Sequence, residues 1–335
     1  LLVYLTLIAI FTPFTFHFIR FQTEITDFLF GEMTHKIANG LGWKIDPYEN
    51  FTSDSLQLHL LYGILFVMAS VLLIILKRFE FINKHSRQLD QFLRSILVYF
   101  LALITLKYGL DKLNGNQFYF PEPNLLFTPL GYLDKDILYW SVMGTSPGYV
   151  CFLGVIEIIT ALLILFRKTR VVGLVFALIT YTQVVAINFG FDISVKLFSS
   201  YLLVITLTLL YPYLVITYQG LKSQTPILFS NQQFRQNKKR LIVESLAIIF
   251  ILVEACYPAY VSNKMNHEIP AEGNMYGAYE VINPSNPRGI KRIFIHKDDY
   301  LIMQTTDDEF VDFKLSWSMD KDIIYITDYN NQIFT

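Results

Sequence analysis

Long apolar segments are the feature that most constrains how this sequence can fold. A membrane-spanning helix needs about 20 predominantly apolar residues. Seven segments have this length and character: about 1–19, 56–76, 93–110, 148–166, 171–191, 195–217 and 241–261. The composition agrees, because 53% of the 335 residues are hydrophobic and only 16% are charged. The sequence therefore predicts an all-α polytopic membrane bundle of about seven spans over residues 1–262.

The first predicted span is the least regular of the seven. Its apolar run is interrupted by Pro13 and His17, neither of which favours a continuous membrane helix. The sequence also starts at Leu1 rather than at a Met. We therefore expect the natural chain to begin upstream of Leu1.

Basic residues lie in alternate loops and predict the orientation of the bundle. Lys and Arg close to the ends of spans are retained on the cytoplasmic side. The basic loops follow the second, fourth and sixth spans and contain Lys77, Arg78, Lys84 and Arg87; Arg167, Lys168 and Arg170; and Lys222, Arg235, Lys238, Lys239 and Arg240. This order predicts a cytoplasmic N-terminus and an extracytoplasmic C-terminus. The net charge of −1 favours no nucleic-acid partner.

After Tyr260 the composition changes, and residues 263–335 are expected to form a small extracytoplasmic β-rich domain. The stretch EFVDFKLSW has an apolar residue at every second position, as in a half-buried strand: Val311, Phe313, Leu315 and Trp317. The stretches KRIFIH, YLIMQ and IIYIT have a similar character and are separated by the polar tips KDD, TDDE and MDKD. The sequence therefore predicts an antiparallel sheet. The acidic tips lack the spacing of a known calcium-binding loop and are interpreted as solvated turns.

Polar residues of four consecutive spans are expected at one depth, in the outer half of the membrane. They are Lys107, Asp111 and Lys112 in the third span, Glu157 in the fourth, Gln183, Asn188 and Asp192 in the fifth, and Lys196, Ser199 and Ser200 in the sixth. A charge near the bilayer centre costs about 2.5–3.5 kcal/mol on insertion scales, so it is expected to face the bundle interior and a partner. We expect Glu157 to pair with Lys107 or Lys196, or to be protonated. Two interpretations stay open: a structural ion pair and a polar cavity that opens outward. Glu254, in the last span, is interpreted as structural.

The two cysteines, Cys151 and Cys256, fall near the outer ends of their spans. A disulfide persists on that side of the membrane, but free cysteines are also common in apolar surroundings. Both states stay open. No spacing of His, Cys or carboxylates resembles a metal, haem, flavin or iron–sulfur site.

The outer loop between the third and fourth spans combines prolines with aromatic residues. Its sequence, NQFYFPEPNLLFTPLGYLDKDILYW, contains Pro121, Pro123, Pro129, Phe118, Tyr119, Phe120, Tyr139 and Trp140. Prolines interrupt regular structure, and aromatic rings of this kind collect at the membrane interface. The loop is predicted to be an interfacial belt or a lid over the polar cavity.

The order of these polar residues resembles the DoxX-like membrane family, in the long form of Bacteroidetes-type bacteria. The resemblance covers about residues 93–215 and includes Tyr-Gly-x-x-Lys in YGLDKL, a span with Glu157 followed by Arg-x-x-Arg, and Asp-x-x-x-Lys-Leu-x-Ser in DISVKLFS. It implies a bacterial inner-membrane protein with its C-terminal domain on the periplasmic side. It also implies relatives that accompany thiosulfate or quinone oxidoreduction.

The stretch YGLDKL is also similar to part of the membrane domain of the vitamin K-dependent carboxylase family. In that family, the lysine matching Lys112 is the base toward hydroquinone, and an extracytoplasmic β-rich part follows the helices. The peptide-recognition parts of that family have no counterpart here. The similarity therefore implies a role for Lys112 but not carboxylation.

Three classes of function follow, and the sequence does not decide whether the protein is an enzyme. The first is a quinone- or redox-associated membrane subunit, with a quinone as the expected ligand, proton-exchanging candidates Lys112, Lys107 and Glu157, and candidate ligand-binding residues Tyr108, Asn188, Asp192 and Lys196. The second is a non-catalytic scaffold or assembly subunit of a membrane or envelope complex, which docks a protein partner through the outer β domain. The third is a small-molecule or lipid carrier, which ranks last because no inverted repeat is seen.

Overall fold

The structure is a computed structural model that describes residues 1–14, 16–18, 21–45, 51–79, 84–223, 238–262, 275–282, 289–296, 300–317, 324–327 and 333–334. The chain divides into two compact units. The first consists of Leu1–Leu113 with Cys151–Lys264, and the second of Asn114–Val150 with Met265–Thr335. The loop between the third and fourth spans thus belongs to the same unit as the C-terminal strands.

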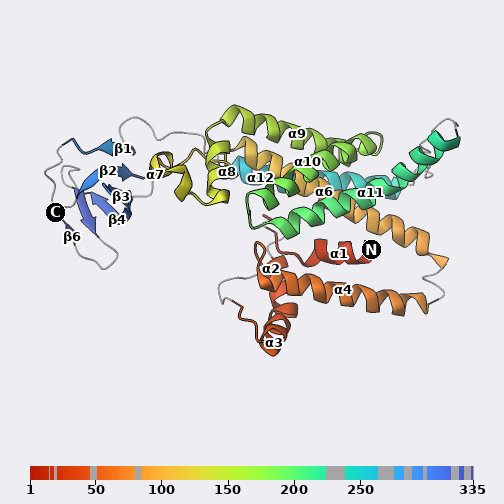
Figure 1. Cartoon of the computed structure of the whole chain (residues 1–335). Coiled ribbons are helices and arrows are strands. Elements are labelled where there is room, and N and C mark those ends of the chain that lie inside the picture. Colours follow the sequence, from red (N-terminus) through yellow and green to blue (C-terminus); the bar gives the residue numbers. More distant parts are fainter. Residues whose placement is uncertain are drawn as a thin grey trace. The chain divides into compact units, whose positions relative to one another are not determined.

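The first unit is a helical bundle (Figure 1). Its helices are α1 (Leu2–Phe11), α2 (Phe21–Thr26), the π-helical turn η1 (Asp27–Gly31), α3 (Glu32–Gly40), α4 (Leu56–Lys77), α6 (Ser86–Leu113), α9 (Pro147–Leu165), α10 (Arg170–Gly190), α11 (Lys196–Ser223) and α12 (Lys238–Ser262). In the part of the chain that the structure describes, six helices are long and apolar enough to cross a membrane: α4, α6, α9, α10, α11 and α12. These six correspond to the second through seventh predicted spans.

The first predicted span, about 1–19, is not one continuous helix. Helix α1 ends at Phe11, and Thr12 has an extended backbone with φ −75° and ψ 117°. The residue before a proline is disfavoured in the helical region, and the following Pro13 has no N–H to continue the helical hydrogen bonds. The prediction of a full-length helix was therefore wrong, for a reason that the sequence contains.

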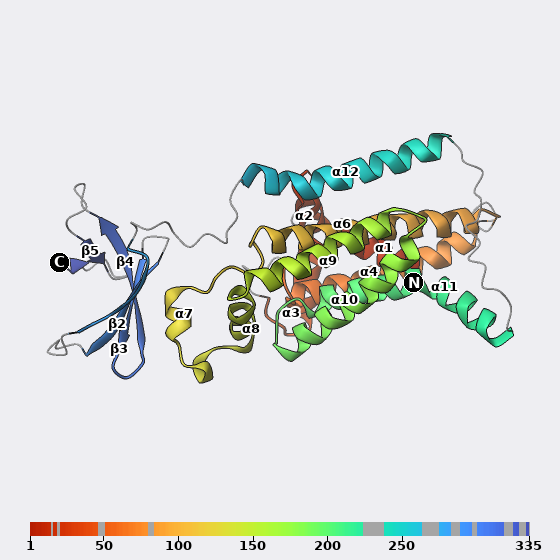
Figure 2. The same cartoon turned by 90° about the horizontal axis from the view of Figure 1, so that it is seen from above.

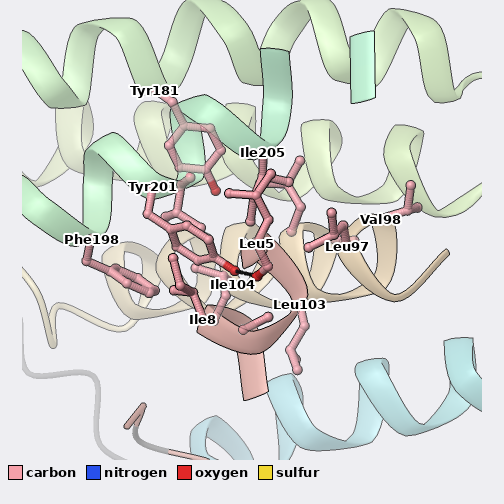
Figure 3. Close-up of a cluster of buried hydrophobic side chains, with 14 of the residues drawn as sticks. Leu5, Ile8, Leu97, Val98, Leu103, Ile104, Tyr181, Phe198, Tyr201 and Ile205 are labelled. Carbon is pink, nitrogen blue, oxygen red and sulfur yellow. Dashed lines mark hydrogen bonds between the residues drawn. The ribbon is translucent and has the colours of Figure 1, made fainter. Parts of the chain in front are cut away.

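Although α1 has only ten residues, it is packed within the bundle beside α4 and α6. Leu5 and Ile8 of α1 belong to a large cluster of buried apolar side chains contributed by most helices of the first unit. The hydroxyl of Tyr201 on α11 donates a 2.7 Å hydrogen bond to the carbonyl of Leu5 (Figure 3). A short helix thus replaces a full span in this part of the core.

The second unit contains α7 (Pro123–Phe127), the 3₁₀ turn η2 (Leu130–Tyr132), α8 (Lys135–Gly144) and a sheet (Figure 2). The strands are β1 (Gly277–Glu280), β2 (Ile290–Ile295), β3 (Tyr300–Thr305), β4 (Phe310–Trp317), β5 (Ile324–Thr327) and β6 (Ile333–Phe334). They pair antiparallel in sequence order. The four predicted strands are confirmed as β2 to β5, whereas β1 and β6 were not predicted. The predicted tips KDD and MDKD lie outside the described residues.

The predicted alternation in β4 is partly confirmed. Phe313 and Leu315 are buried and pack with Ile295 and Leu301 of the neighbouring strands, but Val311 is 43% exposed.

In the loop between α6 and α9, Phe118 packs against Tyr139 and Trp140, with ring centroids 6.0 and 4.7 Å away. The loop is therefore an ordered set of short helices with its own aromatic contacts.

Candidate functional site

Helix α6 places Lys112 against Glu157 of α9. The Lys112 Nζ atom lies 2.9 Å from Glu157 Oε1 and 2.7 Å from Oε2, and each side chain is only 8% exposed. The prediction that Glu157 faces the bundle interior is confirmed. The predicted partners, Lys107 and Lys196, were wrong, because α6 extends to Leu113 and buries the Lys112 side chain.

Two glycines allow α6 and α9 to approach closely enough for this pair. A Cβ atom on Gly154 would lie 2.7 Å from the carbonyl oxygen of Gly109, and one on Gly109 would lie 2.9 Å from that of Gly154. Each glycine stands three residues before a member of the ion pair, so glycine and charged residue share one face of their helix. The close backbone contact and the ion pair are therefore adjacent features of one interface.

Tyrosines and a threonine extend this polar region. The Lys112 Nζ atom lies 5.7 Å from the ring centroid of Tyr108. About two turns along α6 from Lys112, the hydroxyls of Thr105 on α6 and Tyr181 on α10 are 2.6 Å apart and hydrogen-bonded. Tyr181 is almost completely buried. The bundle interior between α6, α9 and α10 thus holds a series of polar groups rather than a single pair.

Asn188 of α10 is a buried polar residue that the helix geometry is expected to bring to the level of Lys112. It follows Tyr181 by seven residues on α10, as Lys112 follows Thr105 on α6, and seven residues return to the same helix face. Helices α6 and α10 run parallel because each is antiparallel to α9, so Asn188 and Lys112 are expected at similar depth. Asn188 is buried, and its Nδ2 atom has no hydrogen-bond partner among the described residues.

The other predicted ligand-binding residues form a separate cluster at the start of α11. The Lys196 Nζ atom lies 2.7 Å from Asp192 Oδ1 and 3.9 Å from Asp54 Oδ2. The Asp54 carboxylate also accepts the N–H groups of Lys196 and Leu197, each at 2.9 Å. Asp192 and Lys196 therefore belong to the ion pairs and hydrogen bonds at the N-terminus of α11, and they are not partners of Glu157.

Lys107 belongs to a second buried pair, with Glu254 of α12. Its Nζ atom lies 3.8 Å from Glu254 Oε1, and the glutamate side chain is completely buried. The backbone N–H groups of His17 and Phe18 also donate to this carboxylate. Lys107 and Lys112 are five residues apart, which at 3.6 residues per turn rotates them by about 140° around α6. These contacts agree with the structural role expected for Glu254, whereas its partners, Lys107 and the backbone of residues 17 and 18, were not predicted.

Cys151 and Cys256 are both free and exposed, so the structure contains no disulfide between them. Within the described ranges, no group of three or more His, Cys, Asp or Glu side chains is placed to hold a metal ion. A cavity of about 520 Å³ in the first unit does not include Lys112 or Glu157; it is lined by Ile159, Leu162, Leu163, Phe166, Arg167, Lys168 and Thr169.

Comparison with known proteins shows similarity to a protein of Bacillus subtilis (strain 168) described as "Uncharacterized protein YwoB". The two are 34% identical over 113 residues, which are 33% of this chain and 71% of the relative. No family model matches the chain, and no solved structure matches it.

Proposed function

The chain belongs to the same family as Bacillus subtilis YwoB, and we propose that it is an integral membrane protein that binds a quinone-class compound beside the Lys112–Glu157 pair. The observation that carries this proposal is the buried acid–base pair between two apolar helices, α6 and α9. Ionisable residues inside membrane spans are costly and usually mark a functional site.

The groups around the pair suit a ring carbonyl. Binding such a ligand in an apolar pocket requires a few convergent hydrogen-bond donors. Asn188 has a buried amide donor that no described residue pairs with, and Tyr108 lies against Lys112. The reduction of a quinone also needs protons at its oxygens, and an adjacent ammonium and carboxylate are groups that exchange protons. The resemblance to the DoxX-like family, whose relatives accompany quinone oxidoreduction, supports the same ligand class.

A matched pair of double variants tests the proposal. In K112M/E157L both charges are replaced by apolar residues, which avoids an unpaired buried charge. The control R167M/E244L removes an ion pair between the turn after α9 and α12 in the same way. The proposal predicts that quinone is extracted from the purified wild type and the control but not from K112M/E157L. Equal quinone content in all three proteins, or none in any, contradicts it.

We propose further that the protein lies in a bacterial inner membrane, with the second unit on the periplasmic side. The alternating basic loops and the family resemblance support this orientation. The test uses a chain whose Cys151 and Cys256 are replaced by serine, with one new cysteine at Ser223, at the end of α11, or at Asp307, in an exposed turn. An impermeant thiol reagent should label Asp307→Cys in intact cells and Ser223→Cys only after permeabilisation. The reverse pattern contradicts the orientation.

A scaffold function is the alternative, and one observation in the second unit favours it. A cavity of about 440 Å³ has an apolar part and an acidic part, formed by Leu125, Thr128, Tyr132, Leu133, Asp134, Ile137, Asp307, Asp308, Glu309 and Phe310. Such a combination is typical of a surface that binds a protein segment. A partner that co-purifies with the wild type, is lost in Phe310→Asp, and is accompanied by no quinone would favour the scaffold.

A further inference from the structure

The backbone that follows α1 is irregular at a depth where regular structure is normally required. Helix α1 ends at Phe11, and residues 12–14 and 16–18 are not helical. Their neighbours Lys107 and Glu254 lie within the apolar helices α6 and α12. In a membrane, non-helical backbone occurs only where protein or a polar cavity covers it, and broken helices of this kind form ligand sites in transporters.

Three donors converge at this break. The Phe18 N–H donates at 2.9 Å to Glu254 Oε2, the His17 N–H donates to Oε1, and the Lys107 ammonium lies 3.8 Å from Oε1. Two adjacent N–H groups and a cation define a site for one carboxylate, since such charge-assisted hydrogen bonds are stronger than neutral ones. Glu254 fills this site from a helix more than 230 residues further along the chain.

The helix that supplies Glu254 is the least embedded of the six. Only 17% of the residues in its apolar 18-residue stretch are buried, against 28–44% in the corresponding stretches of the other five helices. Its buried side chains near the site are Ile251, Glu254 and Ala255. Of the described residues of α12, Ile251 and Ala255 belong to the buried core cluster, so a displacement of α12 that frees the three donors would loosen the core at these two positions.

From this arrangement we infer that the N–H groups of His17 and Phe18, together with Lys107, form a binding site for the carboxylate of a fatty acid, and that Glu254 occupies it as a tethered ligand. The surroundings select an apolar ligand. The Lys107 Nζ atom lies 5.9 and 6.0 Å from the ring centroids of Phe14 and Phe16. The ring centroids of Tyr257 and His17 are 4.4 Å apart. A carboxylate on an alkyl chain matches both the donors and the apolar walls, and the bilayer supplies it.

Removal of the tethered carboxylate tests the inference. In Glu254→Ala the three donors are unoccupied, and the variant should bind labelled myristate with one molecule per chain in equilibrium dialysis. A tethered competitor lowers apparent affinity strongly, so the affinity should exceed that of the wild type at least about tenfold. Tetradecanol, which has the same chain length and no charge, should not compete. The matched control is Glu244→Ala, which removes the other ion-paired glutamate of α12 and should bind like the wild type.

A second variant covers the case in which Glu254→Ala does not fold. Glu254→Gln keeps the side-chain volume and one acceptor oxygen but removes the charge that Lys107 attracts, so myristate should displace it more easily than Glu254. Adding Lys107→Met to either variant should abolish the gain in myristate binding. Equal myristate binding by the wild type and both Glu254 variants, or equal binding of myristate and tetradecanol, overturns the inference. Because this site does not include Lys112 or Glu157, a negative result for myristate binding would leave the proposed quinone binding untouched.

Discussion

Two lysines of one helix, Lys112 and Lys107 of α6, are buried against glutamates in different ways. Lys112 meets Glu157 between two regular helices, and its ammonium contacts both carboxylate oxygens. Lys107 stands farther from Glu254, whose carboxylate is bound chiefly by backbone N–H groups of the broken segment after α1. The first arrangement is a pair of side chains, whereas the second is a carboxylate that completes a stretch of backbone.

An acid in an apolar helix can therefore pair with one side chain or accept hydrogen bonds from a stretch of backbone. When both members of a buried side-chain pair are replaced with apolar residues, neither charge is left buried without its partner. Backbone N–H groups cannot be removed by substitution, and each one left unsatisfied in an apolar environment is costly. Glu157 and Glu254 look alike in the sequence, but only Glu254 supports the backbone.

The largest effect is expected for Glu254→Leu. Breaking a buried pair costs about 3–5 kcal/mol, and an unsatisfied buried donor adds about 1–3 kcal/mol. Adding Lys107→Met should recover little of this loss, because the N–H groups of His17 and Phe18 stay without an acceptor. Thermal and denaturant unfolding of the purified proteins measures both values. Nearly complete recovery in the double variant would show that the backbone contacts contribute little.

A smaller loss and a large recovery are expected at the other pair. Glu157→Leu should lower the free energy of unfolding by about 3–5 kcal/mol, since it leaves the Lys112 charge buried without its partner. In K112M/E157L most of this loss should be regained, because apolar replacements of a buried pair are often neutral. The same unfolding measurements apply. Equal recovery in this cycle and in the Lys107–Glu254 cycle would remove the distinction between the two pairs.

Most of the long apolar helices could be predicted from the sequence, because apolar length is a local property. The strands β2 to β5 followed from alternation and polar turns for the same reason. The partner of Glu157 could not be predicted, since the choice between Lys107, Lys112 and Lys196 depends on where α6 ends and how it is rotated. Depth and helix rotation are set by contacts such as Gly109 with Gly154, which join residues far apart in the sequence.

At the break after α1, the sequence contains the signal that ends the helix, but it does not show which residue accepts the hydrogen bonds of the backbone that follows. Pro13 indicates an interrupted helix, but nothing local predicts that the freed N–H groups of His17 and Phe18 meet an acid of the last span. Likewise, Cys151 and Cys256 share a predicted depth without being bonded. Equal depth does not place two side chains on facing sides of their helices.

An intermediate effect is expected where the backbones of α6 and α9 meet. A Cβ at Gly154 would overlap the carbonyl of Gly109 and press on Lys112 Cβ at 3.1 Å. Gly154→Ala should therefore force the helices apart at the ion pair and cost about 1–3 kcal/mol, as overpacking does. Gly63→Ala on α4 is the control, since no atom lies within 4 Å of its added Cβ. A Gly154 variant as stable as the Gly63 variant would mean that the close approach does not hold the pair.

The smallest effect is expected for a third acid–base pair, Arg167 with Glu244, which joins the turn between α9 and α10 to α12. The arginine side chain is 40% exposed and that of the glutamate 20%, so both retain part of their hydration when the contact is broken. Exposed ion pairs contribute about 0–1 kcal/mol, and Glu244→Gln should stay within this range in the same unfolding assay. The comparison separates burial from charge pairing, because Glu244 and Glu254 lie on one helix and each faces a cation. If Glu244→Gln were as harmful as Glu254→Leu, attachment of α12 by any ion pair would explain both losses. The hydrogen bonds from the N–H groups of His17 and Phe18 to Glu254 would then add little to the stability.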